Sequence, residues 1–166
     1  MENFQRNKIF SDVFVRYLKN KFGWKYLSVE PSEGDADVRL FSEKQEILFL
    51  QLKEVKKHIN TKMTPMTPGS KSKLSLFEFS LPSLDKIIDK YERHYSDASN
   101  LILLLHLCDG YFTPSDINII NNKEKIIQSK FKGIYIVSPK IEFTSTKGNN
   151  SQEEFVSVIK DAFIVK

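Results

Sequence analysis

A hairpin-like sequence carries three residues that could take part in the hydrolysis of a phosphate ester: Asp37, Gln51 and Lys53. On one side of the turn, polar and apolar residues alternate from Asp37 to Phe41, as they do in a half-buried strand. On the other side, a more apolar stretch ends in Gln51-Leu52-Lys53, and the residues between the two stretches are all polar. The pattern predicts two antiparallel strands and the turn that joins them, at residues 37–41, 46–53 and 42–45.

The register of this hairpin decides whether the three side chains meet. If the turn pairs Ser42 with Glu46, Asp37 lies directly opposite Gln51, and Lys53 follows two residues later on the same face. A carboxylate, an amide oxygen and an ammonium then converge on one patch of sheet. Hydrolysis of a phosphodiester needs a hard cation that polarises the phosphate and generates hydroxide near neutral pH. The ammonium would orient or help deprotonate the attacking water, or stabilise the developing charge.

The elements predicted around the hairpin describe an α/β protein. Apolar residues recur at helical spacing over residues 8–22 and 82–95, residues 115–130 favour a helix, and a capping-box pattern at 151–154 predicts a last helix. Strands are predicted at residues 24–29, 74–79, 101–107 and 134–137. Since no repeat or low-complexity tract interrupts the pattern, we expect a single domain over residues 1–166.

Composition bounds the class of protein. A chain of 166 residues with 40% hydrophobic content suits one well-packed domain. No apolar run approaches the ~20 residues of a membrane span, and the first residues lack the apolar core of a signal peptide. The single Cys108 excludes an internal disulfide and is compatible with a reducing compartment. We therefore expect a cytoplasmic protein with no membrane partner.

Positive charge is concentrated directly after the hairpin. Residues 53–73 carry six lysines against one glutamate, a net charge of +5, while the whole chain carries +4. The part from 57 to 73 is poor in large apolar residues and contains two prolines and a glycine, so we expect a mobile basic loop. A polyanion at the hairpin would lie against this segment. The residues expected to contact nucleic-acid phosphates are Lys56, Lys57, Lys62, Lys71 and Lys73.

The predicted order of elements over residues 8–107 resembles the core of the PD-(D/E)XK nuclease superfamily. In that family the second and third strands carry Asp…(Glu/Gln)-x-Lys, matched here by Asp37 and Gln51-Leu52-Lys53. Glutamine departs from the commonest form and is similar to the variant in Mrr-type restriction endonuclease domains. The stretches 14–18 and 34–38 are similar to archaeal Holliday-junction resolvases. The resemblance implies a restriction-endonuclease-like fold, α-β-β-β-α-β, with a mixed central sheet flanked by helices.

The resemblance also implies a catalytic site and its cofactor. The cofactor would be Mg²⁺, with Mn²⁺ as a substitute, held by oxygen ligands. Asp37 would anchor the ion, and the Gln51 side chain and the Leu52 backbone carbonyl would contribute further oxygens. A glutamine in place of glutamate removes one negative charge, so cation binding should weaken unless another carboxylate approaches. Asp35 is the first candidate for this carboxylate, because in a strand its side chain would lie on the same face as that of Asp37. Glu30 and Asp12 follow.

The expected function is metal-dependent endonucleolytic cleavage of DNA, and two alternatives stay open. A degenerate nuclease fold could bind nucleic acid or a protein without cutting. The three polar residues could also be the solvated face of an amphipathic hairpin, because any half-exposed sheet alternates in this way. The sequence does not distinguish DNA from RNA. Two cuts across a duplex generally need two active sites, which makes a homodimer plausible.

Overall fold

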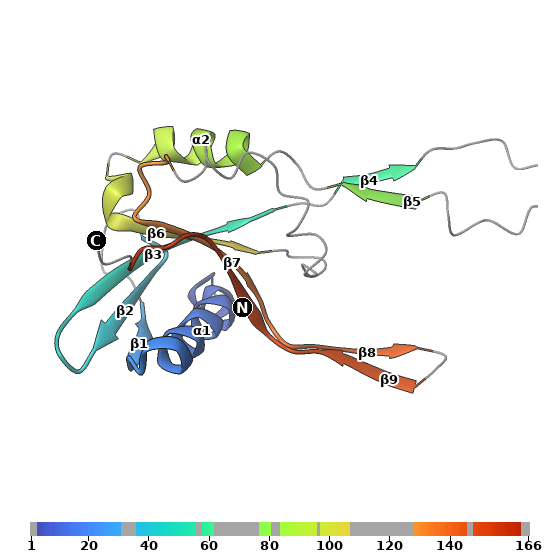
Figure 1. The fold of residues 1–166 in the computed structure, drawn as a ribbon, viewed down its shortest axis with the longest axis horizontal. Coiled ribbons are helices and arrows are strands. Elements are labelled where there is room, and N and C mark those ends of the chain that lie inside the picture. The colour runs from blue at the N-terminus through green and yellow to red at the C-terminus, as the bar shows by residue number, and fades with distance from the viewer. Residues whose placement is uncertain are drawn as a thin grey trace, which may run out of the picture.

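A six-stranded mixed sheet with one α-helix on each face forms the body of the molecule (Figure 1). This computed structural model describes residues 3–30, 36–55, 58–61, 77–80, 84–95, 97–106, 128–145 and 148–163. The helices are α1 (Asn3–Phe22) and α2 (Leu84–His94), and a short 3-10 helix covers Ala98–Asn100. The strands are β1 (Tyr26–Val29), β2 (Val38–Ser42), β3 (Ile47–Glu54), β4 (His58–Thr61), β5 (Phe77–Ser80), β6 (Leu101–His106), β7 (Gly133–Ser138), β8 (Ile141–Ser145), β9 (Gly148–Gln152) and β10 (Phe155–Lys160).

The sheet has the strand order β1-β2-β3-β6-β7-β10. Strands β3, β6 and β7 run parallel to one another, and the remaining neighbours are antiparallel. Two antiparallel hairpins, β4–β5 and β8–β9, extend beyond the sheet on the same side (Figure 1). The predicted α/β architecture with a mixed sheet and flanking helices is therefore confirmed.

The β2–β3 hairpin has the predicted register. Leu40 pairs with Leu48, and the backbone N–H of Ser42 donates to the carbonyl of Glu46 at 3.1 Å. The Ser42 hydroxyl accepts a hydrogen bond from the Glu46 backbone at 3.2 Å, so the turn satisfies its own polar groups. Gln45 takes the left-handed conformation that the tight turn requires, with a φ of 63°. The local turn chemistry thus fixes which residues of the two strands face each other.

Two hydrophobic cores lie on opposite faces of the sheet. One contains Val13, Phe14 and Leu18 of α1, and the other contains Ile88 of α2. The central strand β6 is buried along its whole length, as predicted for a continuous apolar run in a sheet that is covered on both sides. Its odd-numbered residues belong to the α2 core and its even-numbered leucine and isoleucine residues to the α1 core. Residues that alternate along a strand are therefore assigned to one helix or the other.

The prediction of a last helix that starts at residue 151 is wrong. The capping-box pattern covers the end of β9 and the two residues that link it to β10, which runs antiparallel to β7. Phe155 pairs with Ser138 and Val158 with Tyr135, and Ile159 is buried in the α2 core. A capping box stabilises a helix end only locally, whereas this ladder pairs a stretch rich in β-branched residues with a buried strand.

Other segments differ from expectation in their bounds. Helix α1 begins at Asn3 instead of residue 8, because Phe4 packs against the α1 core and extends the apolar face. Residues 58–61, expected within a loop, form β4 and pair with β5, for example Ile59 with Phe79. The rest of the expected 57–73 loop and nearly all of the expected 115–130 helix lie outside the described residues.

Gly133 at the start of β7 offers a test of the packing. A Cβ at this position would lie 2.6 Å from the Ala162 Cβ and 2.9 Å from a ring carbon of Tyr135. The two neighbours are joined, because the Ala162 backbone N–H donates to the Tyr135 hydroxyl at 2.8 Å. We therefore expect Gly133→Ala to lower the free energy of unfolding by about 1–3 kcal/mol. Chemical denaturation of the purified variant measures this. Gly23→Ala is not a suitable control because Gly23 has a φ of 74°, so Ser99→Ala on the exposed surface serves instead.

Candidate functional site

Asp37 lies directly before β2, where that strand stops covering its neighbour β3. Its backbone N–H donates to the Leu50 carbonyl at 2.9 Å. Its carboxylate Oδ2 accepts a hydrogen bond from the Leu52 backbone N–H at 3.0 Å. The Asp37 carboxylate therefore accepts the Leu52 N–H in place of a backbone carbonyl of β2, because β2 does not extend this far. This contact orients the carboxylate toward β3.

Gln51 meets Asp37 across the hairpin, as the register predicted. Its Nε2 donates to Asp37 Oδ2 at 2.8 Å. Because a carboxylate only accepts, this contact fixes the orientation of the amide. The side-chain oxygen, Oε1, then faces away from Asp37 and is buried without a hydrogen bond from any described residue. The Gln51 side chain is only 3% exposed, so an unsatisfied acceptor here is costly.

The Leu52 carbonyl points to the same open side of β3. In a strand, the N–H and C=O of one residue point to the same neighbour. Val55 donates its N–H to the His106 carbonyl in β6 at 2.7 Å, whereas the Leu50 carbonyl accepts from Asp37 on the β2 side. Leu52 is two residues after Leu50, so its carbonyl points to the same side of β3. It therefore faces the space beyond the end of β2. Asp37 and Leu52 thus present oxygens around one end of that strand, and Gln51 presents its Nε2 to Asp37.

Burial favours the protonated form of the Asp37 carboxyl. Removal from water raises the pKa of the carboxyl above its ordinary value of 3.8, and the Leu52 hydrogen bond and the positive charge of Lys53 offset this only in part. The hydrogen bonds from Gln51 and Leu52 both go to Oδ2, and no described residue donates to Oδ1. A cation near Oδ1 would favour the ionised form and reverse the direction of the shift.

Lys53 lies two residues beyond Gln51 on the α2 side of the sheet, where its neighbour in β6 is Leu105. Its ammonium Nζ lies 5.0 Å from the ring centre of Tyr91 and 5.6 Å from that of Tyr95. Burial lowers the pKa of Lys53, but hydrogen bonding with Tyr95 and the electrostatic effects of Tyr95, Asp37 and Tyr91 raise it by more. The Lys53 ammonium is therefore a cation in contact with two aromatic rings, on the same face of the sheet as Asp37 and Gln51.

The other expected carboxylates do not gather at this point in the described structure. Asp12 lies on α1, where it accepts from Ser28 at 2.9 Å and forms an ion pair with Lys8 at 2.7 Å. Glu30 is exposed, and its backbone carbonyl accepts from Arg39. Asp35 lies outside the described residues. Among the residues that are described, no group of three or more His, Cys, Asp or Glu side chains could hold a metal ion.

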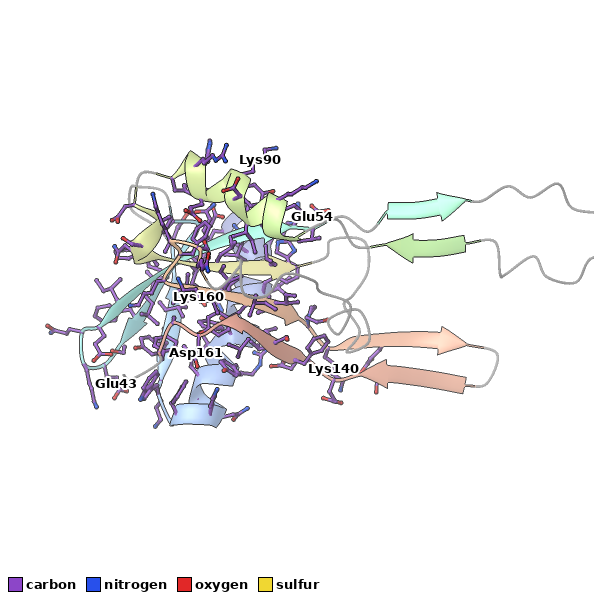
Figure 2. All side chains as sticks on the ribbon, turned by 45° about the horizontal axis from the view of Figure 1, so that its top comes forward. Glu43, Glu54, Lys90, Lys140, Lys160 and Asp161 are labelled. Atoms are coloured by element: carbon purple, nitrogen blue, oxygen red, sulfur yellow. The ribbon has the colours of Figure 1, made fainter. Side chains whose placement is uncertain are left out.

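The end of β3 that carries the site faces the β4–β5 hairpin, as Glu54 marks in Figure 2, and Glu43 marks the turn at the opposite end. Glu54 pairs with Arg6 of α1 at 3.7 Å, so its carboxylate is engaged on the other face of the sheet. The lysines expected to contact phosphates lie outside the described residues and are Lys56, Lys57, Lys62, Lys71 and Lys73.

Sequence reasoning missed the two tyrosines beside Lys53. Both lie in the stretch 82–95, whose apolar residues predict a helix. Both do pack in the α2 core, Tyr95 as a buried residue and Tyr91 as a partly buried one. Tyr91 lies in α2, and Tyr95 directly follows His94, the last residue of that helix. A polar end on each ring, next to a lysine on the facing strand, is the signal that could have identified them.

Comparison of the chain with known protein families, with characterised proteins and with solved structures finds no match. Within the described residues, no helix is long and apolar enough to cross a membrane.

Proposed function

We propose that this protein is a metal-dependent endonuclease that hydrolyses phosphodiester bonds in DNA. The observation that carries the proposal is the buried Gln51 Oε1, an acceptor without a hydrogen bond from the described residues, in an amide whose Nε2 contacts the carboxylate of Asp37. An oxygen left in this way suits a ligand that brings positive charge, and Asp37 and Lys53 supply the remaining chemistry of the motif.

The arrangement of the elements supports the same proposal. The chain order α1-β1-β2-β3-α2-β6 follows the α-β-β-β-α-β core of the PD-(D/E)XK nucleases, with the β4–β5 hairpin inserted before α2. Asp37 and the Gln51-Leu52-Lys53 triplet occupy the positions at which that family carries its motif. We propose a restriction-endonuclease-like topology on these grounds.

The residues fit a hard divalent cation. Mg²⁺ prefers oxygen ligands and keeps several waters, so one or two carboxylates suffice. Asp37 Oδ1 and the Leu52 carbonyl are the protein oxygens that would hold it. Gln51 Oε1 would join them once the amide turns over, because in the structure it is Nε2 that faces Asp37. When bound, the ion would polarise the phosphate and lower the pKa of a coordinated water. A single carboxylate among these ligands predicts weak binding, unless Asp35 also approaches.

The residues of the chain have separate roles in this scheme. Asp37 positions the Gln51 amide through the 2.8 Å hydrogen bond and so aims Oε1 away from itself. The Leu52 N–H holds the carboxylate against β3 at 3.0 Å. Lys53 places a positive charge on the same face, where a phosphate beside Asp37 would meet it.

A non-catalytic binding module is the second candidate, and one observation favours it. Asp37 Oδ2 already accepts hydrogen bonds from both Gln51 and Leu52, a structural role that needs no metal. Such a module would use Lys53 and the basic segment after β3 to bind nucleic acid without cutting it.

Incubation of the purified protein with nucleic acids tests the proposal. Duplex, single-stranded and branched DNA, and a matched RNA, are incubated with Mg²⁺, with Mn²⁺ and with a chelator. We expect metal-dependent cleavage of DNA that the chelator stops. Binding that leaves every substrate intact would favour the module instead.

Gln51→Glu tests whether residue 51 touches the ion. The change places a second carboxylate at the buried oxygen, so we expect tighter binding of Mn²⁺, by about tenfold, in calorimetry of the protein without nucleic acid. Without metal, two carboxylates in contact should raise the pKa of the pair and destabilise the fold. Glu46→Gln, in the turn at the far end of the hairpin, is the matched control. Unchanged affinity in Gln51→Glu would remove residue 51 from the ligand set.

A further inference from the structure

Strands β1, β2 and β3 leave one face of the sheet uncovered beside the candidate site. Their other face packs against α1, since Tyr26, Leu40 and Leu48 all belong to the α1 core. On the α2 side, the hydrophobic core takes Phe49 at its border but, among the described residues, none from β1 or β2. In Figure 1 the β2–β3 turn correspondingly projects away from α2. We call the α2 side of these three strands the open face.

The register arranges the residues of the open face in rows that start at the candidate site. Asp37 and Gln51 form the first row and share the hydrogen bond described above. Arg39 forms the second row, because it pairs with Val29 of β1 and with Phe49 of β3. Directly paired residues lie on the same face of a sheet, and each row is about 7 Å further along β2 than the one before. Arg39 therefore lies between the candidate site and the turn.

The third row of the open face is apolar and exposed. Phe41 pairs with Leu27 of β1 on one side and with Ile47 of β3 on the other. Leu27 is 72% exposed, Ile47 43% and Phe41 42%. The row lies about 13 Å from Asp37 along β2. Adjacent large apolar side chains that face water mark a surface that binds a partner.

The guanidinium of Arg39 is held in place and keeps donors for a ligand. Its Nε and Nη2 both donate to the Glu30 carbonyl, at 3.3 Å and 3.0 Å. A guanidinium has further N–H donors, and no other described residue accepts from this one. The remaining donors suit a phosphate that follows one bound at Asp37. The open face thus combines a fixed cation with an exposed aromatic ring.

These properties fit a nucleic-acid strand better than a second copy of the chain. A specific protein interface uses about 20–30 residues on each side, whereas the exposed apolar row has three described side chains. Of the described residues in the three strands, the charged ones on this face are Arg39 and Lys53, both positive. Aromatic rings beside cations bind the bases and phosphates of single-stranded nucleic acid.

We propose that the open face binds unpaired nucleotides next to the scissile phosphate, with Arg39 on the neighbouring phosphate and Phe41 stacked on a base. Leu27 and Ile47 extend the apolar surface on either side of the ring. The inference rests on the proposed function for the position of the scissile phosphate at Asp37. It makes the substrate a DNA with a single-stranded stretch, because a base within a duplex must first be unstacked to meet a side chain face to face.

The first experiment measures binding in a chelator, where no cleavage occurs. Fluorescence anisotropy follows a labelled single-stranded oligonucleotide and a blunt duplex of the same length. We expect Phe41→Leu, which stays apolar but loses the ring, to weaken single-strand binding by about tenfold and to leave duplex binding within about twofold. Phe41→Tyr keeps the ring and should bind like the wild type. Ile9→Ala, which changes an exposed apolar side chain on α1, is the matched control and should alter neither affinity.

Arg39→Gln tests the phosphate contact in the same assay. The loss of one contact to a single strand should decrease the slope of log K against log salt by about 0.7. Lys19→Gln removes an exposed cation from α1 and should leave the slope unchanged.

The second experiment compares cleavage of a blunt duplex with that of a duplex that carries a single-stranded tail, in Mg²⁺ and in Mn²⁺. We expect the tailed duplex to be cut faster by about tenfold and Phe41→Leu to lose this preference. Equal rates on the two substrates would overturn the inference and leave the nuclease function intact.

Two further outcomes decide between the open face and its alternatives. Wild-type affinity for the single strand in both Phe41→Leu and Arg39→Gln would overturn the inference, and a dimer that Phe41→Leu converts to a monomer in analytical ultracentrifugation would then assign the row to contacts between copies. If binding changes as expected but no substrate is cleaved, the nuclease proposal fails. The open face would then stand as a surface that binds single strands.

Discussion

Asp37→Ala should reduce metal-dependent cleavage by at least about a hundredfold. The change removes the one described carboxylate that contacts Gln51, and with it the group that orients the Gln51 amide. It also leaves the Leu52 N–H without its acceptor. Cleavage of duplex DNA under single-turnover conditions in Mg²⁺ and Mn²⁺ measures the loss.

The controls for Asp37 distinguish chemistry from folding. Asp37→Asn keeps an acceptor for the Leu52 N–H, so it should fold like the wild type and still fail to cleave. Asp12→Asn changes a carboxylate of similar burial on α1, which contacts Ser28 and Lys8, and should retain activity. Cleavage by Asp37→Asn within about tenfold of the wild type would contradict a role for Asp37 as a metal ligand.

The raised pKa of Asp37 has a consequence for stability. Its ordinary value is 3.8, and burial raises the folded value above this. The folded protein therefore binds the proton more tightly than the unfolded chain does, and the contribution of Asp37 to the free energy of unfolding falls as pH rises through this window. Saturating Mg²⁺ should remove the dependence, because it favours the carboxylate. Thermal melts of wild type and Asp37→Asn with and without Mg²⁺ measure it.

Lys53→Met should lower kcat by about a hundredfold to a thousandfold while nucleic-acid binding changes much less. The substitution keeps the apolar stem that lies between β3 and α2 but removes the charge beside Asp37. Only one phosphate contact is lost, so the salt dependence of binding should decrease by a slope of about one. Gel-shift titrations at several salt concentrations, together with single-turnover cleavage, separate the two effects.

Lys53→Arg is the informative companion. Arginine keeps the charge, but its planar guanidinium does not fit the position of a compact ammonium between the rings of Tyr91 and Tyr95. We expect binding to survive and kcat to stay low. Full activity in Lys53→Arg would show that the position of the charge is not critical, and equal activity in Lys53→Met would exclude a catalytic role for Lys53.

The sequence by itself determined the hairpin and the meeting of Asp37 with Gln51. The turn is closed by Ser42 and Glu46, residues four apart, and alternation along each strand then assigns every side chain to a face. A register set by so short a turn needs no information from the rest of the chain. The buried strand β6 was equally predictable, since only a central strand tolerates six consecutive buried residues.

Tertiary structure decided what sequence patterns left open. The 151–154 capping box indicated a helix, but pairing with β7, a strand that precedes it by a whole hairpin, made residues 155–160 the sixth strand of the sheet. The contacts of Tyr91 and Tyr95 with Lys53 likewise depend on how α2 crosses the sheet. Local patterns record short-range preferences only, and long-range pairing and helix packing bury enough surface to override them.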